Sequence, residues 1–310
     1  MVAIRDAFGK ALAELGEKNK DVVVLDADLA SSTCVTLFAE KFPERFFQCG
    51  IAEQNMIGIA AGLASCGKIP FAASFAAFVS RRPADQVAVS VAYPKLNVKI
   101  IGAYTGLFNG KTGASHMAVE DVSIMRAIPG IVVIDPADAT EIRKALEAIA
   151  QYKGPVYMRE TRDEWPDIFD DSYKFEIGKA ALIKDGSDAS IISSGVMTSE
   201  SMKAALELEK EGIKVRVVNM STIKPIDAKA IIKCAEDTGA IVTAKNHNIY
   251  GGLGSAVAEV LVEGYPVPMQ RVGIKDVLNE SGTNKELLHK YGMSHNHIME
   301  AVKKVISRKK

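Results

Sequence analysis

Apolar residues of this chain change their spacing repeatedly between that of a helix and that of a buried strand. Ile4, Phe8 and Leu12 recur at intervals of four residues, which is the spacing of one helix face. The run DVVVLDADL that follows is short and almost wholly apolar, which is typical of a strand covered on both faces in a parallel sheet. The same alternation predicts further strands at 45–49, 69–73, 98–103, 131–134 and 155–158, and helices at 4–18, from 31 to Pro43, 51–65, 75–91, 119–127 and 137–151.

The alternation is interrupted once and then resumes. Residues 162–175, RDEWPDIFDDSYKF, are polar, acidic and contain a proline, as linkers between domains often do. Strands are predicted again at 189–193, 215–219 and 240–244, and helices at 199–211, 228–236, 254–262, 285–290 and 295–307. We therefore expect an α/β fold with two domains, 1–165 and 177–310, each a mostly parallel sheet covered by helices and joined by a linker at 166–176.

Composition narrows the function classes. The chain has 310 residues, of which 48% are hydrophobic, so each domain has enough apolar residues for a core. Lys plus Arg and Asp plus Glu number 38 each, which argues against nucleic acid or an anionic membrane as a partner. The apolar-rich region 50–80 contains Glu53 and Lys68, so it is not a membrane span. Four cysteines without CxxC spacing indicate a cytoplasmic protein with neither disulfides nor a metal site of its own.

Glu53 is the first candidate for chemistry. It stands in GIAEQNMIGIAAG, residues 50–62, a run that is otherwise apolar apart from two amides. A carboxyl group in apolar surroundings tends to hold its proton, because desolvation disfavours the anion. The alternative is a solvated acid in the first turn of a helix, where the helix dipole favours it.

Two further features of the first domain suggest a site for a flat heterocycle. Phe75, Phe78 and Arg81 lie three residues apart, so one helix face would carry two rings and a guanidinium. His116 closes the long Gly-rich loop TGLFNGKTGASH, and histidine is suited to proton transfer near neutral pH. Taken singly, these residues are better explained by an ordinary core helix and by a structural loop histidine.

The combination of motifs resembles the transketolase family of thiamine-diphosphate enzymes. GIAEQNMIGIAAGLA, SFAAFVSRRPADQV, GASHMAVEDVSIMRAIPG and DPADATE look like its pyrimidine-binding domain, in the same order. GSDASIISSG, VNMSTIKPID and GGLGSAVAE look like its C-terminal domain, so the resemblance covers essentially the whole chain.

The resemblance implies a role for each of the residues singled out above. Glu53 would hydrogen-bond N1′ of the cofactor's aminopyrimidine, and Phe75 and Phe78 would pack against that ring. Arg81 stands where most transketolases carry Tyr, and resembles deoxyxylulose-phosphate synthases in this respect. His116 would contact the carbonyl and hydroxyl region of the substrate.

Other positions match those that hold the sugar phosphate. They are Arg5, Ser32 and Arg162, and arginine suits this task through bidentate, charge-assisted bonds. Arg159 is an alternative counterpart of Arg162, and Arg5 can equally be a solvated helix residue.

Two substrate positions depart from the family pattern. Tyr104 stands where most members have a phosphate-contacting His, and Thr112 where they have an Asp that bonds a substrate hydroxyl. These changes leave the identity of the sugar open.

The chain has no GDG segment, by which transketolases hold the cofactor's diphosphate through Mg²⁺. The resemblance therefore implies the C-terminal subunit of a split transketolase, which transfers a two-carbon ketol unit between sugar phosphates. Thiamine diphosphate would be shared with an N-terminal partner subunit that holds the Mg²⁺, in an α2β2 heterotetramer that alone is active. The alternatives are the β subunit of a 2-oxo acid dehydrogenase E1, a deoxyxylulose-phosphate-synthase-like enzyme and a non-catalytic regulatory paralogue.

Overall fold

The strands expected in the first half of the chain form one sheet. The structure is a computed structural model that describes residues 2–309, and its larger sheet has seven strands in the order β10-β5-β6-β4-β3-β1-β2. Neighbouring strands run parallel, except for β10, which runs antiparallel to β5. The strands are β1 Val22–Asp26, β2 Phe46–Gln48, β3 Ile69–Phe75, β4 Lys99–Ala103, β5 Val132–Ile134, β6 Val156–Glu160 and β10 Thr222–Lys224.

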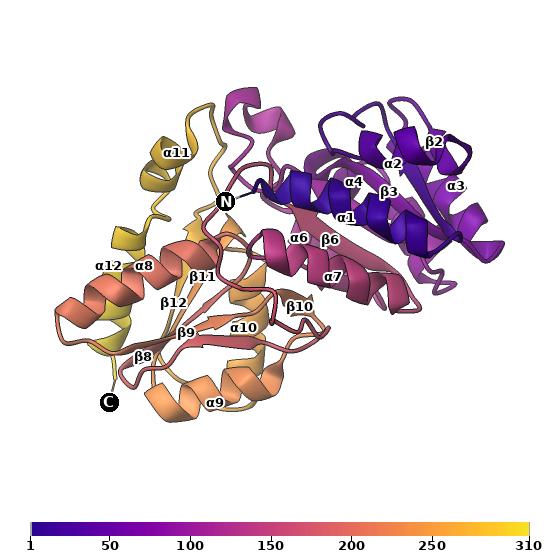
Figure 1. Ribbon diagram of the computed structural model, residues 1–310. Coiled ribbons are helices and arrows are strands. Elements are labelled where there is room, and N and C mark those ends of the chain that lie inside the picture. The colour runs from indigo at the N-terminus through magenta and orange to yellow at the C-terminus, as the bar shows by residue number, and fades with distance from the viewer. Residues whose placement is uncertain (1, 310) are drawn as a thin grey trace.

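Helices cover both faces of this sheet, because successive strand residues point to opposite sides. Val22 and Val24 pack with α1 and α7, whereas Val23 and Leu25 pack with α3 and η2. Figure 1 shows α1 and α7 lying side by side on one face of the sheet. The helices of this part are α1 Ile4–Lys18, α2 Thr36–Lys41, η1 Pro43–Arg45, α3 Glu53–Ser65, α4 Ala76–Arg81, α5 Ala84–Gln86, η2 Val87–Ala92, η3 Gly110–Thr112, η4 Ala114–His116, α6 Asp121–Ala127 and α7 Ala139–Gln151.

The single helix expected over 75–91 is wrong. The segment is divided into α4, α5 and η2, the last with the wider hydrogen bonding of a π-helix. Pro83 lies at the break, and a proline inside a helix both removes a backbone donor and clashes with the preceding turn. Because of this break, the residues just after Phe78 form the end of a short helix instead of the middle of a long one.

A second sheet follows, with strand order β12-β11-β8-β9-β7. Its neighbours are parallel except for β7, which is antiparallel to β9. The edge strands β7 and β12 were missed by the sequence pattern. The elements are β7 Ala181–Lys184, β8 Ala189–Ser193, α8 Met197–Lys210, β9 Val215–Asn219, α9 Ala228–Thr238, β11 Ile241–Asn248, α10 Leu253–Glu263, β12 Met269–Ile274, α11 Asn284–Lys290 and α12 His295–Ile306. The α/β fold class with two mostly parallel sheets is therefore confirmed.

The two halves are joined by more than the segment between β6 and β7. Strand β10 belongs to the second half of the chain but pairs with β5 at the edge of the first sheet, Thr222 opposite Ile134. The Lys224 ammonium donates to the carbonyl oxygens of Arg126 and Ile128, at 2.8 and 2.6 Å. The two large clusters of buried apolar side chains each contain residues from both sheets. The two domains are therefore packed into one body.

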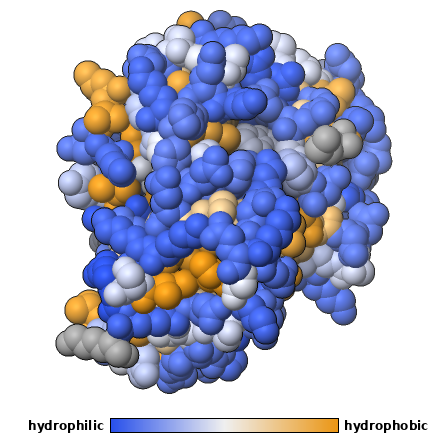
Figure 2. Space-filling view, turned by 90° about the vertical axis from the view of Figure 1, so that its left-hand side faces the viewer, coloured by the Kyte–Doolittle hydropathy of each residue, from blue (hydrophilic) through white to orange (hydrophobic). Residues whose placement is uncertain are grey.

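The molecular surface is largely polar. On the face shown in Figure 2, apolar side chains lie in separate patches among hydrophilic ones. Within residues 2–309, no helix combines the length and the apolar character needed to cross a membrane.

Candidate functional site

Glu53 is buried and paired with an arginine. It is the first residue of α3, and its side chain is only 2% exposed. Nη1 of Arg82 lies 2.8 Å from each of its two carboxylate oxygens. The same guanidinium lies over the ring of Phe78, 4.1 Å from its centroid. Glu53 is thus a buried acid, not the solvated first-turn residue that the sequence left open.

Four aromatic rings gather beside this pair. The ring centroids of Phe75 and Phe78 are 5.8 Å apart, and His116 is 5.1 Å from Phe78. Tyr104 extends the cluster on the other side, 4.5 Å from Phe75. Phe75 ends β3 and Tyr104 follows β4, and the carboxyl ends of parallel strands meet at one edge of a sheet, where ligands commonly bind.

Two arginines border the Tyr104 side of the cluster. Arg5 donates from Nη1 to the hydroxyl oxygen of Tyr104 at 2.6 Å. The Arg162 guanidinium lies over the same ring, 5.1 Å from its centroid. Ser32 is half-buried in the turn after β1, where its N–H donates to the carbonyl oxygen of Leu29, a residue that packs against Phe75 and Tyr104.

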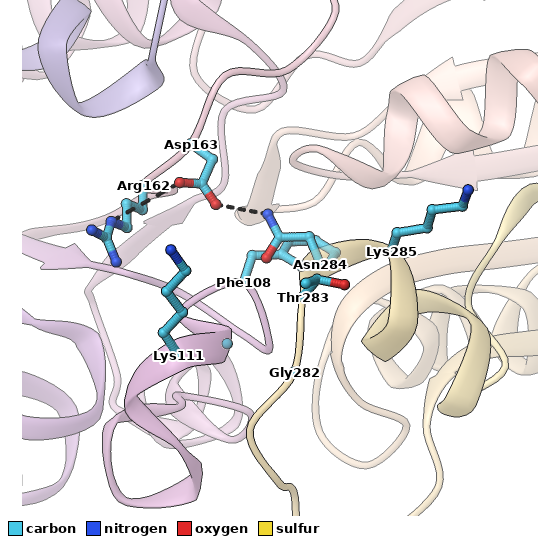
Figure 3. A pocket seen from close by; sticks show the side chains of 9 residues that line it. Phe108, Lys111, Arg162, Asp163, Gly282, Thr283, Asn284 and Lys285 are labelled. Carbon is cyan, nitrogen blue, oxygen red and sulfur yellow. Dashed lines mark hydrogen bonds and ion pairs between the residues drawn. The ribbon is translucent and has the colours of Figure 1, made fainter.

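A pocket of about 440 Å³ opens next to Arg162 at the junction of the two domains. Figure 3 shows the side chains of Lys111 and Arg162 ending in the same region, whereas Lys285 points away from them. The acid in the lining, Asp163, accepts a hydrogen bond from Asn284 at 2.7 Å and faces Arg162. The pocket is lined by Phe108, Gly110, Lys111, Arg162, Asp163, Gly282, Thr283, Asn284 and Lys285. With Lys111 and Arg162 pointing into it, its charge favours an anion.

Two of the sequence-predicted residues lie outside this arrangement. Arg81 pairs with Glu120 and donates to the carbonyl oxygen of Met117 at 2.9 Å, so it does not contact Glu53. Thr112 is exposed, and its hydroxyl donates to the carbonyl oxygen of Asn109 in its own loop at 2.8 Å.

The residue of this arrangement that sequence reasoning missed is Arg82. A signal was present, because Arg82 follows Phe78 by four residues and such pairs share a helix face. The sequence analysis chose the neighbouring Arg81 instead, because it follows Phe75 and Phe78 at regular intervals of three residues. The break at Pro83 ends the helix at this point, and the amide of Gln54 donates to the Arg82 carbonyl oxygen at 3.1 Å, which fixes its backbone.

Arg159 belongs to a buried ionic network between the domains. Its Nε lies 2.9 Å from Asp121 and its Nη1 lies 3.1 Å from Asp135. From the second domain, Lys245 pairs with Asp135 at 2.6 Å, and the Asn246 carbonyl oxygen accepts from Arg159 at 3.1 Å. Burial by itself would raise the pKa of Asp135, but Arg159 and Lys245 hold it well below its usual range. Every donor of Arg159 faces this network, so Arg162 is the arginine that faces the pocket.

Glu160, next to Arg159, is a second buried acid. It is fully buried at the end of β6, and within the part of the chain described neither of its carboxylate oxygens has a hydrogen-bond partner. Burial raises the pKa of Glu160 well above its usual range, the nearby charge of Arg5 lowers it, and Asp6 raises it further. Nothing in the sequence pattern distinguished this residue from an ordinary strand residue.

The arrangement offers no metal site of its own. Among residues 2–309, no group of three or more His, Cys, Asp or Glu side chains is placed to hold a metal ion.

Comparison with known proteins identifies both domains. Residues 1–167 match the family "Transketolase, pyrimidine binding domain", and residues 178–298 match "Transketolase, C-terminal domain". A 6-deoxy-6-sulfo-D-fructose transketolase subunit, SqwH, of Clostridium sp. (strain MSTE9) is 45% identical over 99% of this chain and 95% of that protein. A putative transketolase C-terminal section of Methanocaldococcus jannaschii is 47% identical over 97% of this chain and 96% of that protein.

A solved structure and a single-chain transketolase are also similar to this chain. A split gene transketolase, solved as an inactive beta4 tetramer, superposes with a TM-score of 0.93, at 47% identity and full coverage of both chains. Rat transketolase is 37% identical over 99% of this chain but only 49% of its own length. The chain thus corresponds to the C-terminal half of a single-chain transketolase and to the whole of separately encoded subunits. The predicted resemblance is confirmed, and the chain belongs to the transketolase family.

Proposed function

We propose that this chain is the C-terminal subunit of a two-subunit transketolase that transfers a two-carbon ketol unit between sugar phosphates. The observation that carries the proposal is Glu53, a buried carboxylate beside the face of Phe78. The Arg82 guanidinium lies there as a flat group that stacks on Phe78 and hydrogen-bonds the Glu53 carboxylate. An aminopyrimidine ring is also flat, and its ring nitrogen can share a hydrogen bond with a carboxyl group, so the residues fit thiamine diphosphate.

Each residue of the cluster then has a defined task. Glu53 would share a proton with N1′ of the aminopyrimidine, from a side chain that is only 2% exposed. Phe75 and Phe78 orient the ring, and His116 lies beside them to contact the carbonyl and hydroxyl groups of the sugar. The cofactor supplies a carbon nucleophile when bound, and the protein supplies the acid and the geometry. Arg81 remains a proposed neighbour of the cofactor rather than a direct partner of Glu53.

The other end of the substrate is assigned to the cationic side. Arg5, Ser32, Tyr104 and Arg162 are proposed to hold its terminal anionic group, and Thr112 to lie near its hydroxyl groups. Two relatives support a sugar with an anionic end, since one is named for 6-deoxy-6-sulfo-D-fructose and another, 40% identical, for apulose 4-phosphate. Transfer of a ketol unit between pentose phosphates and related sugar phosphates is consistent with such a site.

The proposed enzyme also needs a partner subunit. The N-terminal subunit would hold the diphosphate through Mg²⁺, and the two chains would form an α2β2 heterotetramer in the cytoplasm. The proposal is supported by two relatives that match this chain over almost their whole length and are named as a transketolase subunit and as a transketolase C-terminal section. Within this chain we assign residues 1–165 to the pyrimidine-binding domain, 166–176 to the linker and 177–310 to the C-terminal domain.

The experiment is to capture the partner by affinity purification, co-express both chains and assay ketol transfer from a ketose phosphate to an aldose phosphate. We expect transfer only from the complex with thiamine diphosphate and Mg²⁺. Glu53→Gln should lower kcat at least ~100-fold, because a positioned acid contributes about that much, and should leave assembly intact. Glu120→Gln, which removes the acid paired with the neighbouring Arg81, is the matched control. Transfer by the isolated chain, or near-normal turnover of the Glu53 variant, would refute the proposal.

A further inference from the structure

Arg82 occupies both surfaces that the proposed cofactor needs. Its Nη1 lies 2.8 Å from each oxygen of Glu53, and its guanidinium carbon lies 4.1 Å from the centroid of the Phe78 ring. Glu53 has no other hydrogen-bond partner among the described residues, so this single contact compensates its buried charge. An aminopyrimidine cannot hydrogen-bond Glu53 and stack on Phe78 while the guanidinium remains in place.

The resemblance between the two groups is chemical as well as spatial. A guanidinium is a flat, delocalised group whose N–H donors lie in its own plane, and it stacks on aromatic faces. An aminopyrimidine is likewise flat and, when its ring nitrogen is protonated, donates an N–H in its own plane to a carboxylate. A group that satisfies Glu53 in this way is therefore also a competitor for its natural ligand.

We propose that Arg82 is a positioning residue that holds the place of the aminopyrimidine: it orients Glu53 and balances its charge until the ring displaces the guanidinium into solvent. The inference rests on the proposed function and adds to it a residue that the family resemblance does not assign. Breaking a buried ion pair by removing one partner is costly, and a stand-in avoids leaving Glu53 unpaired before the cofactor binds.

The local structure allows such a displacement. The Arg82 side chain is 44% exposed, whereas that of Glu53 is 2% exposed, so the guanidinium has a direct path to water. Its main chain stays fixed, because the Gln54 amide donates to its carbonyl oxygen and Pro83 follows it. Arg81 is held elsewhere by Glu120 and the Met117 carbonyl oxygen, so it cannot take over the contact without losing its own. Only the Arg82 side chain has to move.

The inference is tested by cofactor affinity, independently of turnover. Thiamine diphosphate with Mg²⁺ is titrated into the reconstituted complex by isothermal calorimetry, for wild type, Arg82→Gln and Arg143→Gln, which removes the arginine of a surface ion pair with Asp171. If Arg82 competes with the ring, its removal should lower the Kd about tenfold, equivalent to ~1.4 kcal/mol, and Arg143→Gln should leave the Kd unchanged. Arg82→Lys keeps the charge but loses the flat fork, and should fall between wild type and Arg82→Gln.

A competition experiment with free guanidinium distinguishes competition for the Glu53 site from a change in structure caused by the substitution. In Arg82→Gly, millimolar guanidinium chloride should weaken thiamine diphosphate binding again, whereas equal sodium chloride should not. Unchanged or weaker cofactor binding by both Arg82→Gln and Arg82→Lys would overturn the inference and leave the proposed function standing. If no complex of any variant binds thiamine diphosphate, the proposed function itself fails, and this inference with it.

Discussion

Replacing the buried Glu160 by glutamine should make the stability of this chain less dependent on pH. The side chain is fully buried, its oxygens have no partner in the described part of the chain, and its pKa is raised well above the usual value, chiefly by burial. Glutamine has nearly the same shape as a protonated glutamic acid but cannot ionise. The substitution therefore removes one titration while keeping the packing at the end of β6.

The sign and the size of the effect follow from proton linkage. An unfolded glutamate loses its proton near pH 4.3, whereas the folded chain keeps the proton at Glu160 to a higher pH. Between the two pKa values the folded state binds one more proton than the unfolded state, so the free energy of unfolding falls as pH rises. Inside this window the slope for one proton is about 1.4 kcal/mol per pH unit. Glu160→Gln lacks this loss.

The assay is urea unfolding of wild type and variant from pH 5 to pH 8. The two should be close in stability at the acidic end, and Glu160→Gln should become increasingly more stable than wild type as pH rises. Glu147→Gln, at an exposed position on α7, is the control and should follow the wild-type profile. A stability difference that is independent of pH, or that grows toward acid, would contradict the assignment of a protonated Glu160.

Two further substitutions test the domain junction. Arg159→Met should lower the free energy of unfolding by about 3–5 kcal/mol in urea titrations, because two buried carboxylates lose their common cation. Half-buried Arg143→Met, which breaks a pair with the exposed Asp171, should cost less than about 1 kcal/mol. Equal costs would argue against the network. Lys111→Met should raise KM about fivefold for a ketose with a terminal phosphate, but not for a ketol donor without an anionic end, and kcat should stay constant. Exposed Lys229→Met on α9 is the control, and an equal KM change for both donors would refute a role for Lys111 in binding the anionic end.

The local pattern failed where an element was short or interrupted. Strand β10 has three residues, too few for a periodicity to appear, and it gains its strand geometry only by pairing with β5. Strands β7 and β12 lie at the edges of their sheet and are only partly buried, so their apolar runs are less continuous. The helix predicted over 75–91 was too long, because the apolar spacing continues past Pro83 whereas the α-helical backbone does not.

The candidate site shows a similar division. Glu53 could be singled out because an acid in an apolar run is conspicuous in any sequence. Which part of that run is buried did not follow from its composition, because Met56 and Ile57 are buried whereas Ile51 and Ile59 are exposed. Arg159 and Arg162 could not be told apart by spacing, because they lie only three residues apart at the start of the same polar segment. Their burial separates them, since Arg159 is enclosed by carboxylates from two elements whereas Arg162 faces the pocket, which favours Arg162 as the proposed ligand of an anion.

The sequence by itself determined the alternation of helices and strands, the two α/β domains, the membership of the transketolase family and the prominence of Glu53. These depend on residue spacing within single elements, which the backbone geometry of helix and strand dictates. Only the tertiary structure decided that Arg82, and not Arg81, pairs with Glu53, and that the second domain adds a strand to the first sheet. Contacts between elements depend on strand order, on where a helix ends and on which side chain reaches a buried charge, and these are set when the whole chain packs.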